Sequence, residues 1–266
     1  MCILFLKFDP RPTTKGAYRL MVAANRDEFF SRPSLAAQFW PSHPHVISGV
    51  DLQEGREGGS WLGVTRGGRF AALTNVLEHS RDTHTRGRGV VMVMVVMVVM
   101  AVMVVAVMSC GTTVTVAMQR LFHYSLLRHG KAAFSVAVRR GGSHSELTEA
   151  LLTILNDTTP VLPDPLLEAQ GDLRMKQLLP QYAAVCVRTP TYGTRTNSVL
   201  LVGVDGRVSF TERTMEEVEE VEEEEEEEVE EVEEVKEEAP ESHSPRWARR
   251  DHHFLLRPQP PPTPLP

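Results

Sequence analysis

The pattern of apolar and polar positions predicts two strand-rich regions separated by a tract of a different kind. In the first region, residues 3–8 and 18–24 are short apolar runs of the type that favours β-strands. Residues 61–65 and 69–74 are two further runs, and the Arg66-Gly67-Gly68 step between them predicts a hairpin. Prolines break the intervening segments. This region therefore predicts four strands with antiparallel pairing.

The second region predicts one helix and three strands. Ser143 and Glu146 have the spacing of a capping box, and the apolar residues after them follow helical spacing as far as Leu155. Residues 181–189, 197–204 and 207–212 favour strands, and Asp205-Gly206 predicts a tight turn between the last two. Strand-rich regions with antiparallel pairing, and a helix set apart from them, predict an α+β fold.

Residues 90–108 are nineteen consecutive Val, Met and Ala residues. A helix of that length would span about 28 Å, close to the roughly 30 Å hydrocarbon core of a bilayer. The arginines just before it could form a positive flank. Met and Ala codons each differ from a Val codon by a single base, so an expanded triplet repeat would give the same string. Both interpretations stay open, and we favour the repeat over membrane contact through this tract.

The net charge of −7 combines two unlike parts of the chain. Residues 216–238 hold 17 glutamates and one lysine, whereas residues 1–215 hold 23 Lys and Arg against 16 Asp and Glu. The basic residues of the body are scattered, which argues against a nucleic-acid partner. We therefore expect a single domain over residues 1–215, interrupted at 90–108, and a disordered acidic and Pro-rich tail over residues 216–266.

The cysteines and the start of the chain indicate a reducing environment. Cys2, Cys110 and Cys186 are an odd number without CxxC spacing, which argues against a disulfide framework and against a structural zinc site. We expect no bound metal and no cofactor. The first residues lack the pattern of a secretory signal, so we expect a cytoplasmic protein.

Cys2 is the first candidate for chemistry. Removal of Met1 would leave Cys2 as the amino-terminal residue, which carries a thiol nucleophile and an amine base together. The amine could accept the thiol proton directly or through water. The alternative is a chance or palmitoylated cysteine without a catalytic role.

Polar residues at the ends of predicted strands are the other candidates. Asn25, Arg26 and Asp27 follow an apolar run and could bind or orient a substrate, although a charged turn is the alternative. Asn75 could donate to an oxyanion or simply occupy a turn, and Arg195 precedes a strand among hydroxyl residues. Paired glycines near a tryptophan could admit a ligand to backbone amides or form a tight turn (Gly58, Gly59 and Trp61).

Taken in order, five motifs resemble the NRDE family. They cover residues 1–88 and about 145–214 and read Met-Cys-Ile-Leu-Phe-Leu-Lys-Phe-Asp-Pro, Ala-Asn-Arg-Asp-Glu-Phe, Glu-Gly-Gly-Ser-Trp-Leu-Gly, Ala-Ala-Leu-Thr-Asn and Tyr-Gly-Thr-Arg-Thr-Asn. The resemblance implies the αββα sandwich of amino-terminal nucleophile hydrolases, with Cys2 at the nucleophile position. The family's Gly-Leu-Ser-Asn step is missing, and the Val/Met tract stands in the middle instead.

The resemblance also implies a role in Golgi organisation and secretory transport and in lipid or haem homeostasis, with association with Golgi and mitochondria. It favours an apolar small-molecule ligand such as acyl-CoA, a lipid or haem, bound with help from Asn25, Gly58, Gly59 and Trp61. The alternative is hydrolysis of an amide or thioester by Cys2, with Asn75 as oxyanion donor and Arg26, Asp27 and Arg195 in positioning roles. We expect residues 1–8 to form a central strand with Cys2 at its exposed end, facing Asn25–Asp27 and Asn75.

Overall fold

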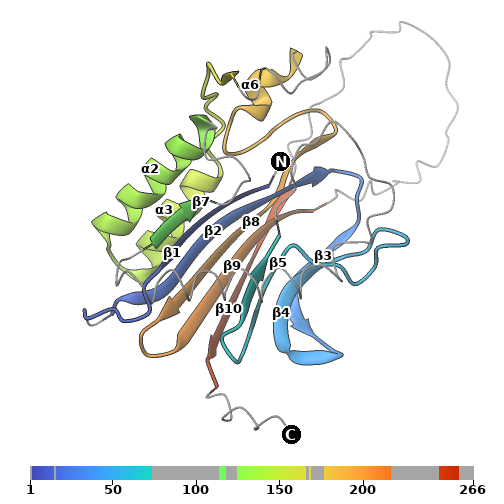
Figure 1. Cartoon of the computed structure of the whole chain (residues 1–266). Helices are drawn as coiled ribbons and strands as arrows, with labels where there is room; N and C mark the ends of the chain where they lie inside the picture. Colours follow the sequence, from blue (N-terminus) through green and yellow to red (C-terminus); the bar gives the residue numbers. More distant parts are fainter. Residues whose placement is uncertain are drawn as a thin grey trace, which may run out of the picture.

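The computed structural model describes residues 2–14, 16–73, 125–165, 168, 177–216 and 246–257, and the backbone of residues 114–117. These residues form two antiparallel sheets and a group of helices, which confirms the α+β class (Figure 1). The Val/Met tract at 90–108 and the candidate Asn75 lie outside the described residues.

The larger sheet has six strands in the order β10-β9-β8-β2-β1-β7. Adjacent strands in this sheet are antiparallel throughout, and the 12-residue strands β2 and β8 pair along almost their whole length. The strands are β1 (Ile3–Phe8), β2 (Tyr18–Phe29), β7 (Val114–Ala117), β8 (Tyr192–Gly203), β9 (Arg207–Glu216) and β10 (Arg246–Leu255). The predicted turn at Asp205-Gly206 joins β8 to β9.

The smaller sheet has four strands in the order β3-β4-β5-β6. They are β3 (Ser34–Trp40), β4 (His43–Asp51), β5 (Leu62–Thr65) and β6 (Phe70–Ala72). The predicted hairpin at Arg66-Gly67-Gly68 is confirmed as the β5–β6 connection. Strands β3 and β4 were not predicted, because prolines interrupt this stretch and Pro44 lies at the exposed start of β4.

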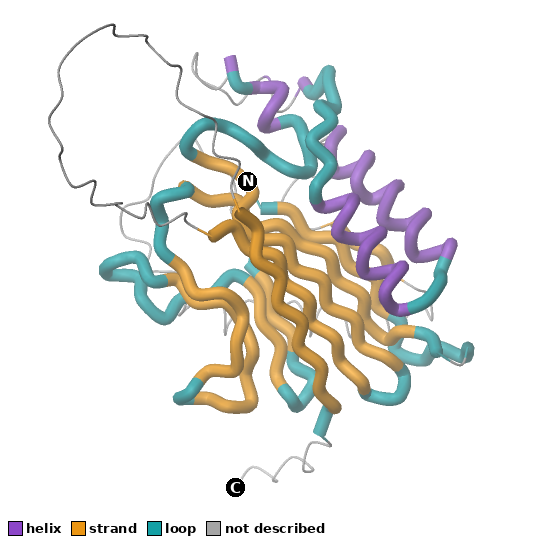
Figure 2. The backbone as a smooth tube through the Cα atoms, turned by 180° about the vertical axis from the view of Figure 1, so that it is seen from behind, coloured by secondary structure: helices purple, strands orange, loops and turns teal. Residues whose placement is uncertain are grey.

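Helices cover one face of the larger sheet (Figures 1 and 2). They are α2 (Ser125–Arg140) and α3 (His144–Leu155), and a short helix α6 (Leu179–Tyr182) follows later in the chain. The predicted capping box is confirmed at the start of α3, where the Glu146 amide donates to the Ser143 hydroxyl and the Ser143 amide donates to the Glu146 carboxylate. The described layers are thus helix, large sheet and small sheet, and a second helical layer is absent from the described residues.

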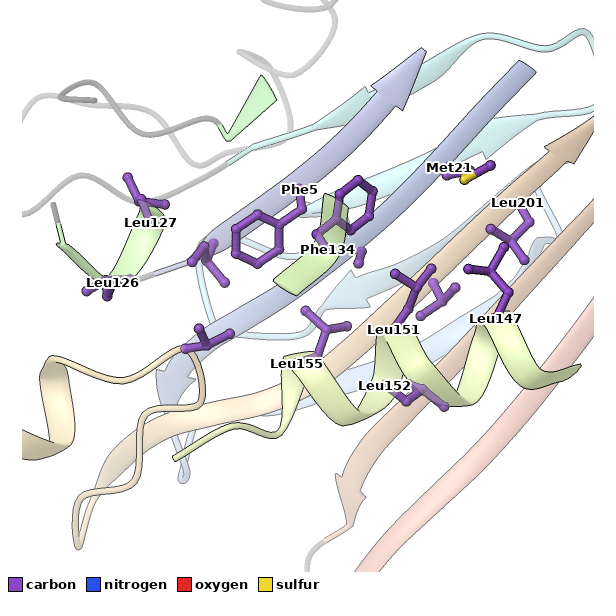
Figure 3. Close-up of a cluster of buried hydrophobic side chains, with 14 of the residues drawn as sticks. Phe5, Met21, Leu126, Leu127, Phe134, Leu147, Leu151, Leu152, Leu155 and Leu201 are labelled. Carbon is purple, nitrogen blue, oxygen red and sulfur yellow. The ribbon is translucent and has the colours of Figure 1, made fainter. Parts of the chain in front are cut away.

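Alternate residues along the strands of the large sheet point to opposite faces, so they contribute to two separate hydrophobic cores. On the helix side, Phe5 of β1 stacks on Phe134 of α2 with 6.0 Å between ring centroids, and leucines of α3 complete the cluster (Figure 3). Gly130 of α2 makes this approach feasible, since a Cβ atom there would lie 2.3 Å from the Phe5 ring. Between the sheets, Leu4, Val22 and other residues of the large sheet pack against the small sheet.

Three expectations about secondary structure were wrong. Strand β2 does not end at residue 24 but continues through the charged residues to Phe29, because β8 pairs with it throughout. Residues 183–190 form turns with one isolated bridge at Arg188 rather than a strand. The segment 216–266 is not disordered throughout: β10 pairs with β9 over ten residues, and Phe254 is buried in the inter-sheet core. Within that segment, residues 217–245 and 258–266 lie outside the described residues.

No helix in the described part of the chain is long and apolar enough to cross a membrane.

Candidate active site

Cys2 lies where the start of β1 meets the end of β2. Ile3 pairs with Asn25, and the Cys2 thiol donates to the backbone carbonyl of Asp27 across 3.7 Å. The expectation that Cys2 is exposed is wrong, because the residue is only 2% exposed. Strand β1 is also not at the centre of the sheet but between β2 and the edge strand β7. Predicted proximity to the Asn25–Asp27 segment is confirmed, whereas proximity to Asn75 is untested.

Asp27 is the centre of a buried polar cluster. Its carboxylate accepts a hydrogen bond of 2.6 Å from the Thr194 hydroxyl, and its carbonyl accepts one of 3.3 Å from the Tyr192 hydroxyl. Burial raises the pKa of Asp27, while the positive amino terminus and the Thr194 hydroxyl act in the opposite direction. Burial and the nearby Asp27 charge also raise the pKa of Tyr192. The Cys2 thiol and the Tyr192 phenol therefore both contact Asp27, whose carboxyl group has a perturbed pKa.

Arg26 points to the other side of β2, into the space between the sheets. Its guanidinium lies 4.3 Å from the centroid of the Trp61 ring, a cation–π geometry, and its Nη1 donates to Ser34 Oγ at 3.4 Å. The indole lies across Gly49 of β4, where a Cβ atom would be 2.3 Å from the ring. A glycine in the small sheet thus makes room for the tryptophan beneath the buried arginine.

Two narrow cavities adjoin Cys2, each of about 10 Å³, or space for roughly one water molecule. The first lies between the sheets and is lined by Cys2, Arg26, Trp61 and Ser198 among others. The second lies toward the helices and includes Tyr182. In the described part of the chain, no group of three or more His, Cys, Asp or Glu side chains is arranged to hold a metal ion. Cys2 is the one residue with a nucleophilic side chain that lines both cavities among the described residues.

Several predicted site residues have structural roles instead. The Asn25 amide donates to the carbonyls of Leu155 at 2.8 Å and Val185 at 2.9 Å, and its oxygen accepts from Asn197 at 2.8 Å. Asn25 therefore joins β2 to α3, to the segment before β8 and to β8 itself. Its side-chain amide is fully engaged within the protein.

Arg195 and the paired glycines are likewise used in local structure. The Nη1 atom of Arg195 donates to the carbonyls of Phe29, at 3.1 Å, and Arg32, which fixes the connection between β2 and β3. The amide of Gly58 donates to the carbonyl of Asp51 at 3.1 Å and that of Gly59 to the carbonyl of Arg56 at 3.3 Å, which closes the connection between β4 and β5. Gly58 has a φ of +77°, which explains the glycine without a ligand.

Sequence reasoning missed three polar residues near the site: Tyr192, Thr194 and Glu212. Thr194 and Tyr192 belong to the Tyr-Gly-Thr-Arg-Thr-Asn motif, in which only the arginine was singled out. Glu212 occupies an inward position of β9, two residues after the buried Phe210, and is 1% exposed. A glutamate at a core position of an alternating strand is a signal that could have found it.

Glu212 connects the two sheets beside Arg26. Its Oε1 accepts from the Ala37 amide at 2.6 Å and from the Thr214 hydroxyl at 3.1 Å. Its Oε2, like the hydroxyl of Thr196, has no hydrogen-bond partner among the described residues. Burial raises the pKa of Glu212 to about 7, although Arg250 and Arg26 lower it.

Comparison with known proteins agrees with the motifs of the sequence. The sequence pattern of the Transport and Golgi organisation 2 family matches residues 1–103 and 105–217. The chain is 40% identical to the Transport and Golgi organization protein 2 homolog of Bos taurus and 39% identical to that of Homo sapiens, in each case over 257 aligned positions. These alignments cover 81% of this chain and 93% of each relative. The Drosophila melanogaster protein is 26% identical over 264 positions.

The aligned stretch is longer than the part of this chain that it covers. Since 81% of 266 residues is fewer than 257, the mammalian relatives contain internal residues that have no counterpart here. This agrees with the missing family step in the middle of the sequence. With a family match over most of its length and these identities, the chain belongs to the Transport and Golgi organisation 2 family.

Proposed function

We propose that this protein contributes to transport and Golgi organisation, as the names of its relatives say, by hydrolysing an amide or thioester of a lipid-like acyl substrate with Cys2. The observation that carries the proposal is the hydrogen bond of 3.7 Å from the Cys2 thiol to the Asp27 carbonyl, inside a cluster of buried polar groups. Titratable groups with perturbed pKa values gather at functional sites more often than elsewhere.

The surroundings of Cys2 favour a nucleophile over a structural thiol. Cys186, the other cysteine in the described part of the chain, is also buried, and burial raises the pKa of its thiol. A raised pKa keeps a thiol protonated and inert. Cys2, in contrast, lines both cavities at the start of β1 and has Arg26 as a neighbour in one of them.

The proposed reaction starts after removal of Met1. The free α-amine of Cys2 accepts the thiol proton, and the thiolate attacks the carbonyl carbon of the substrate. Collapse of the tetrahedral intermediate breaks the bond to the leaving amine or thiol, which receives the proton from the α-ammonium group. Water then attacks the acyl thioester on Cys2, releasing the carboxylic acid and restoring the thiol. The Asp27 carboxylate holds the ammonium group during these transfers.

A binding protein that retained this fold without catalysis is the second candidate. The narrowness of both cavities beside Cys2 supports it, because about 10 Å³ does not admit an acyl chain without rearrangement. In this case the family role would depend on holding an apolar ligand such as acyl-CoA, a lipid or haem away from these two cavities. The two candidates differ in whether turnover depends on Cys2.

An acyl-transfer experiment separates these candidates. The intact mass of the full chain is first measured by mass spectrometry, and retention of Met1 would contradict the proposed mechanism. It is then incubated with an octanoyl thioester of N-acetylcysteamine while released thiol and mass adducts are followed. We expect an octanoyl adduct on Cys2 and steady hydrolysis, both abolished in Cys2→Ala and retained in the matched control Cys186→Ala. Hydrolysis at the same rate in Cys2→Ala would overturn the proposal.

A further inference from the structure

The pairing of β2 with β8 is irregular beside Asp27. Arg26 pairs with Thr196, but the next residue, Asp27, pairs with Thr194, so Arg195 is an extra residue on β8. A β-bulge of this kind changes the direction of the side chains next to it. Regular pairing would place Arg195 opposite Asp27, whereas the bulge places Thr194 there.

The exchange of an arginine for a threonine at this position changes what the carboxylate can do. The Nη1 atom of Arg195 donates instead to the carbonyls of Phe29 and Arg32. A guanidinium opposite Asp27 would form a charge-assisted pair with the carboxylate and compete with any ammonium group for it. A threonine hydroxyl donates one hydrogen bond and leaves the negative charge in place.

The hydroxyl proton of Thr194 has a fixed direction. The Val187 amide donates to Thr194 Oγ1 at 3.0 Å, and the Thr194 amide donates to the Val187 carbonyl at 2.8 Å. Since the Val187 amide supplies its own proton, the single proton of the hydroxyl goes to Asp27 Oδ1, at 2.6 Å. Thr194 is 1% exposed and Asp27 0%, so bulk water does not compete for this bond.

Titratable groups surround Asp27 from several elements. They belong to β1, β2, the segment before β8 and β8 itself, and they are Cys2, Glu28, Cys186 and Tyr192. Burial has the largest effect on the pKa of Asp27 and raises it, and the charge of Glu28 acts in the same direction. The amino terminus and the Thr194 hydroxyl lower this pKa. Loss of the hydroxyl should therefore raise the pKa of Asp27 further.

We propose that Thr194 is the positioning residue for Asp27 in the hydrolysis proposed above, on which this inference rests. Its hydroxyl fixes one oxygen of the carboxylate and helps to keep the carboxylate ionised. Asp27 can then hold the α-ammonium group of Cys2 while the thiolate attacks. Thr194 acts only through Asp27 and does not contact the substrate.

The test is the pH dependence of hydrolysis of the octanoyl thioester by the full chain. Thr194→Val keeps the shape of the side chain but removes the hydroxyl. We expect kcat at pH 7 to fall at least about tenfold with unchanged KM, because a hydrogen bond to a charged group is lost. The acid limb of the kcat profile should move to higher pH, because Asp27 then ionises at higher pH. Thr194→Ser retains the hydroxyl and should restore both the rate and the profile.

Thr211→Val is the matched control. Thr211 of β9 is also 1% exposed, and its hydroxyl donates to the Asp251 carboxylate at the same distance of 2.6 Å. Asp251 belongs to the edge strand β10, which is four strands from β1 in the sheet. We expect Thr211→Val to lose some stability but to keep the wild-type kcat and pH profile. A fall in kcat and a shift of the profile equal to those of Thr194→Val would overturn the proposal, because they would reflect general destabilisation.

Folding is controlled separately, because Thr194→Val also removes the acceptor of the buried Val187 amide. The folded fraction of each variant is measured by circular dichroism, and rates are expressed per folded protein. If Thr194→Val does not fold, Thr194→Ala replaces it, since a water molecule can then bond to the Val187 amide. The acid limb should move in the same direction in Thr194→Ala.

The outcomes separate this inference from the proposed function. Turnover by the wild type with the same kcat and profile in Thr194→Val would overturn the role of Thr194 and leave the hydrolase proposal standing. Absence of turnover in the wild type would overturn the hydrolase proposal, and the positioning role would fall with it. NMR titration of the aspartate carboxyl carbons, with Asp27→Asn to identify the signal, adds a measurement without substrate. An Asp27 titration that is identical in Thr194→Val and wild type would also overturn the proposal.

Discussion

At the Cys2 end of the large sheet, two consecutive residues of β2 enter different environments. Asn25 faces the helices and makes three hydrogen bonds between 2.8 and 2.9 Å. Arg26 faces the small sheet, where its neighbours include Trp61 and the glutamate of β9. All three hydrogen bonds of the Asn25 side chain are therefore made within the protein. Between the sheets, Glu212 Oε2 and Thr196 Oγ1 have no partner among the described residues.

Within β2, Asn25 therefore has a structural role, whereas Arg26 is a candidate for a functional one. A buried polar group with all its partners stabilises a unique arrangement, whereas one that lacks a partner calls for a water, a ligand or a catalytic role as explanation. Thr196 is the register partner of Arg26, so the unsatisfied hydroxyl lies directly beside the buried guanidinium on the neighbouring strand. A water or ligand beside Arg26 would therefore find a hydroxyl group between the sheets that the described residues leave without a partner.

The largest effect on stability should come from removing the hydrogen bonds that Asn25 makes on the helix side of the sheet. Asn25→Ala would leave the carbonyls of Leu155 and Val185 and the amide of Asn197 without that partner. At about 1–3 kcal/mol for each unsatisfied group, we expect a loss of about 5 kcal/mol in the free energy of unfolding, measured by chemical denaturation.

Asn156→Ala is the matched comparison for this change. The Asn156 side chain donates to Leu152 and to Asn197 but is only half-buried, so water can replace those contacts. We expect a loss of about 1 kcal/mol. Equal losses in the two variants would contradict the scaffold role assigned to Asn25.

Local patterns predicted part of the fold correctly. Strand β1, the β5–β6 hairpin and the capped helix α3 each carry their signal within a dozen residues. Strand β10 carries no such signal, because only one of its faces packs and its sequence is dominated by Arg and His. Its pairing with β9 joins segments that a run of 29 residues separates in the sequence. Such long-range pairing is set by tertiary contacts rather than by local preference.

The site was predictable in its members more than in its geometry. Sequence motifs singled out Cys2, Arg26, Asp27 and Trp61, each beside a strand or turn signal, and the structure places Cys2 against Asp27 and in one cavity with Arg26 and Trp61. The burial of the Asn25–Glu28 segment was not predictable, because charged residues at a strand end usually mark a turn. Only the pairing of β2 with β8 takes them into the interior.

The second prediction concerns the inter-sheet side and its dependence on pH. Glu212 has a pKa of about 7 in the folded protein against an ordinary value of 4.5. A raised pKa means that the folded state holds the proton more tightly, so stability is highest below about pH 4.5 and falls as the pH rises to about 7. The fall from this residue should reach up to about 3 kcal/mol.

Glu212→Gln tests this by keeping an acceptor for the Ala37 amide while removing the titration. Stability measured by denaturation from pH 5 to 8 should then decline much less than in the wild type. Some decline should remain, because burial also raises the pKa of Asp27. Glu149→Gln, at an exposed residue of α3, should leave the slope unchanged. An identical slope in Glu212→Gln and wild type would show that this carboxyl does not titrate between the sheets.

The smallest expected effect returns to the helix side, where stability should change without any change in pH dependence. Ser143→Ala removes the hydroxyl that accepts from the Glu146 amide at the start of α3. Loss of such a cap costs about 1 kcal/mol. Because Ser143 is exposed and caps α3 on the helix side of the large sheet, the decline in stability between pH 5 and 8 should match that of the wild type. Ser143→Asp retains a capping oxygen and should restore most of the lost stability. A changed slope in Ser143→Ala would mean that the two faces of the sheet are coupled, and the separation drawn between them would fail.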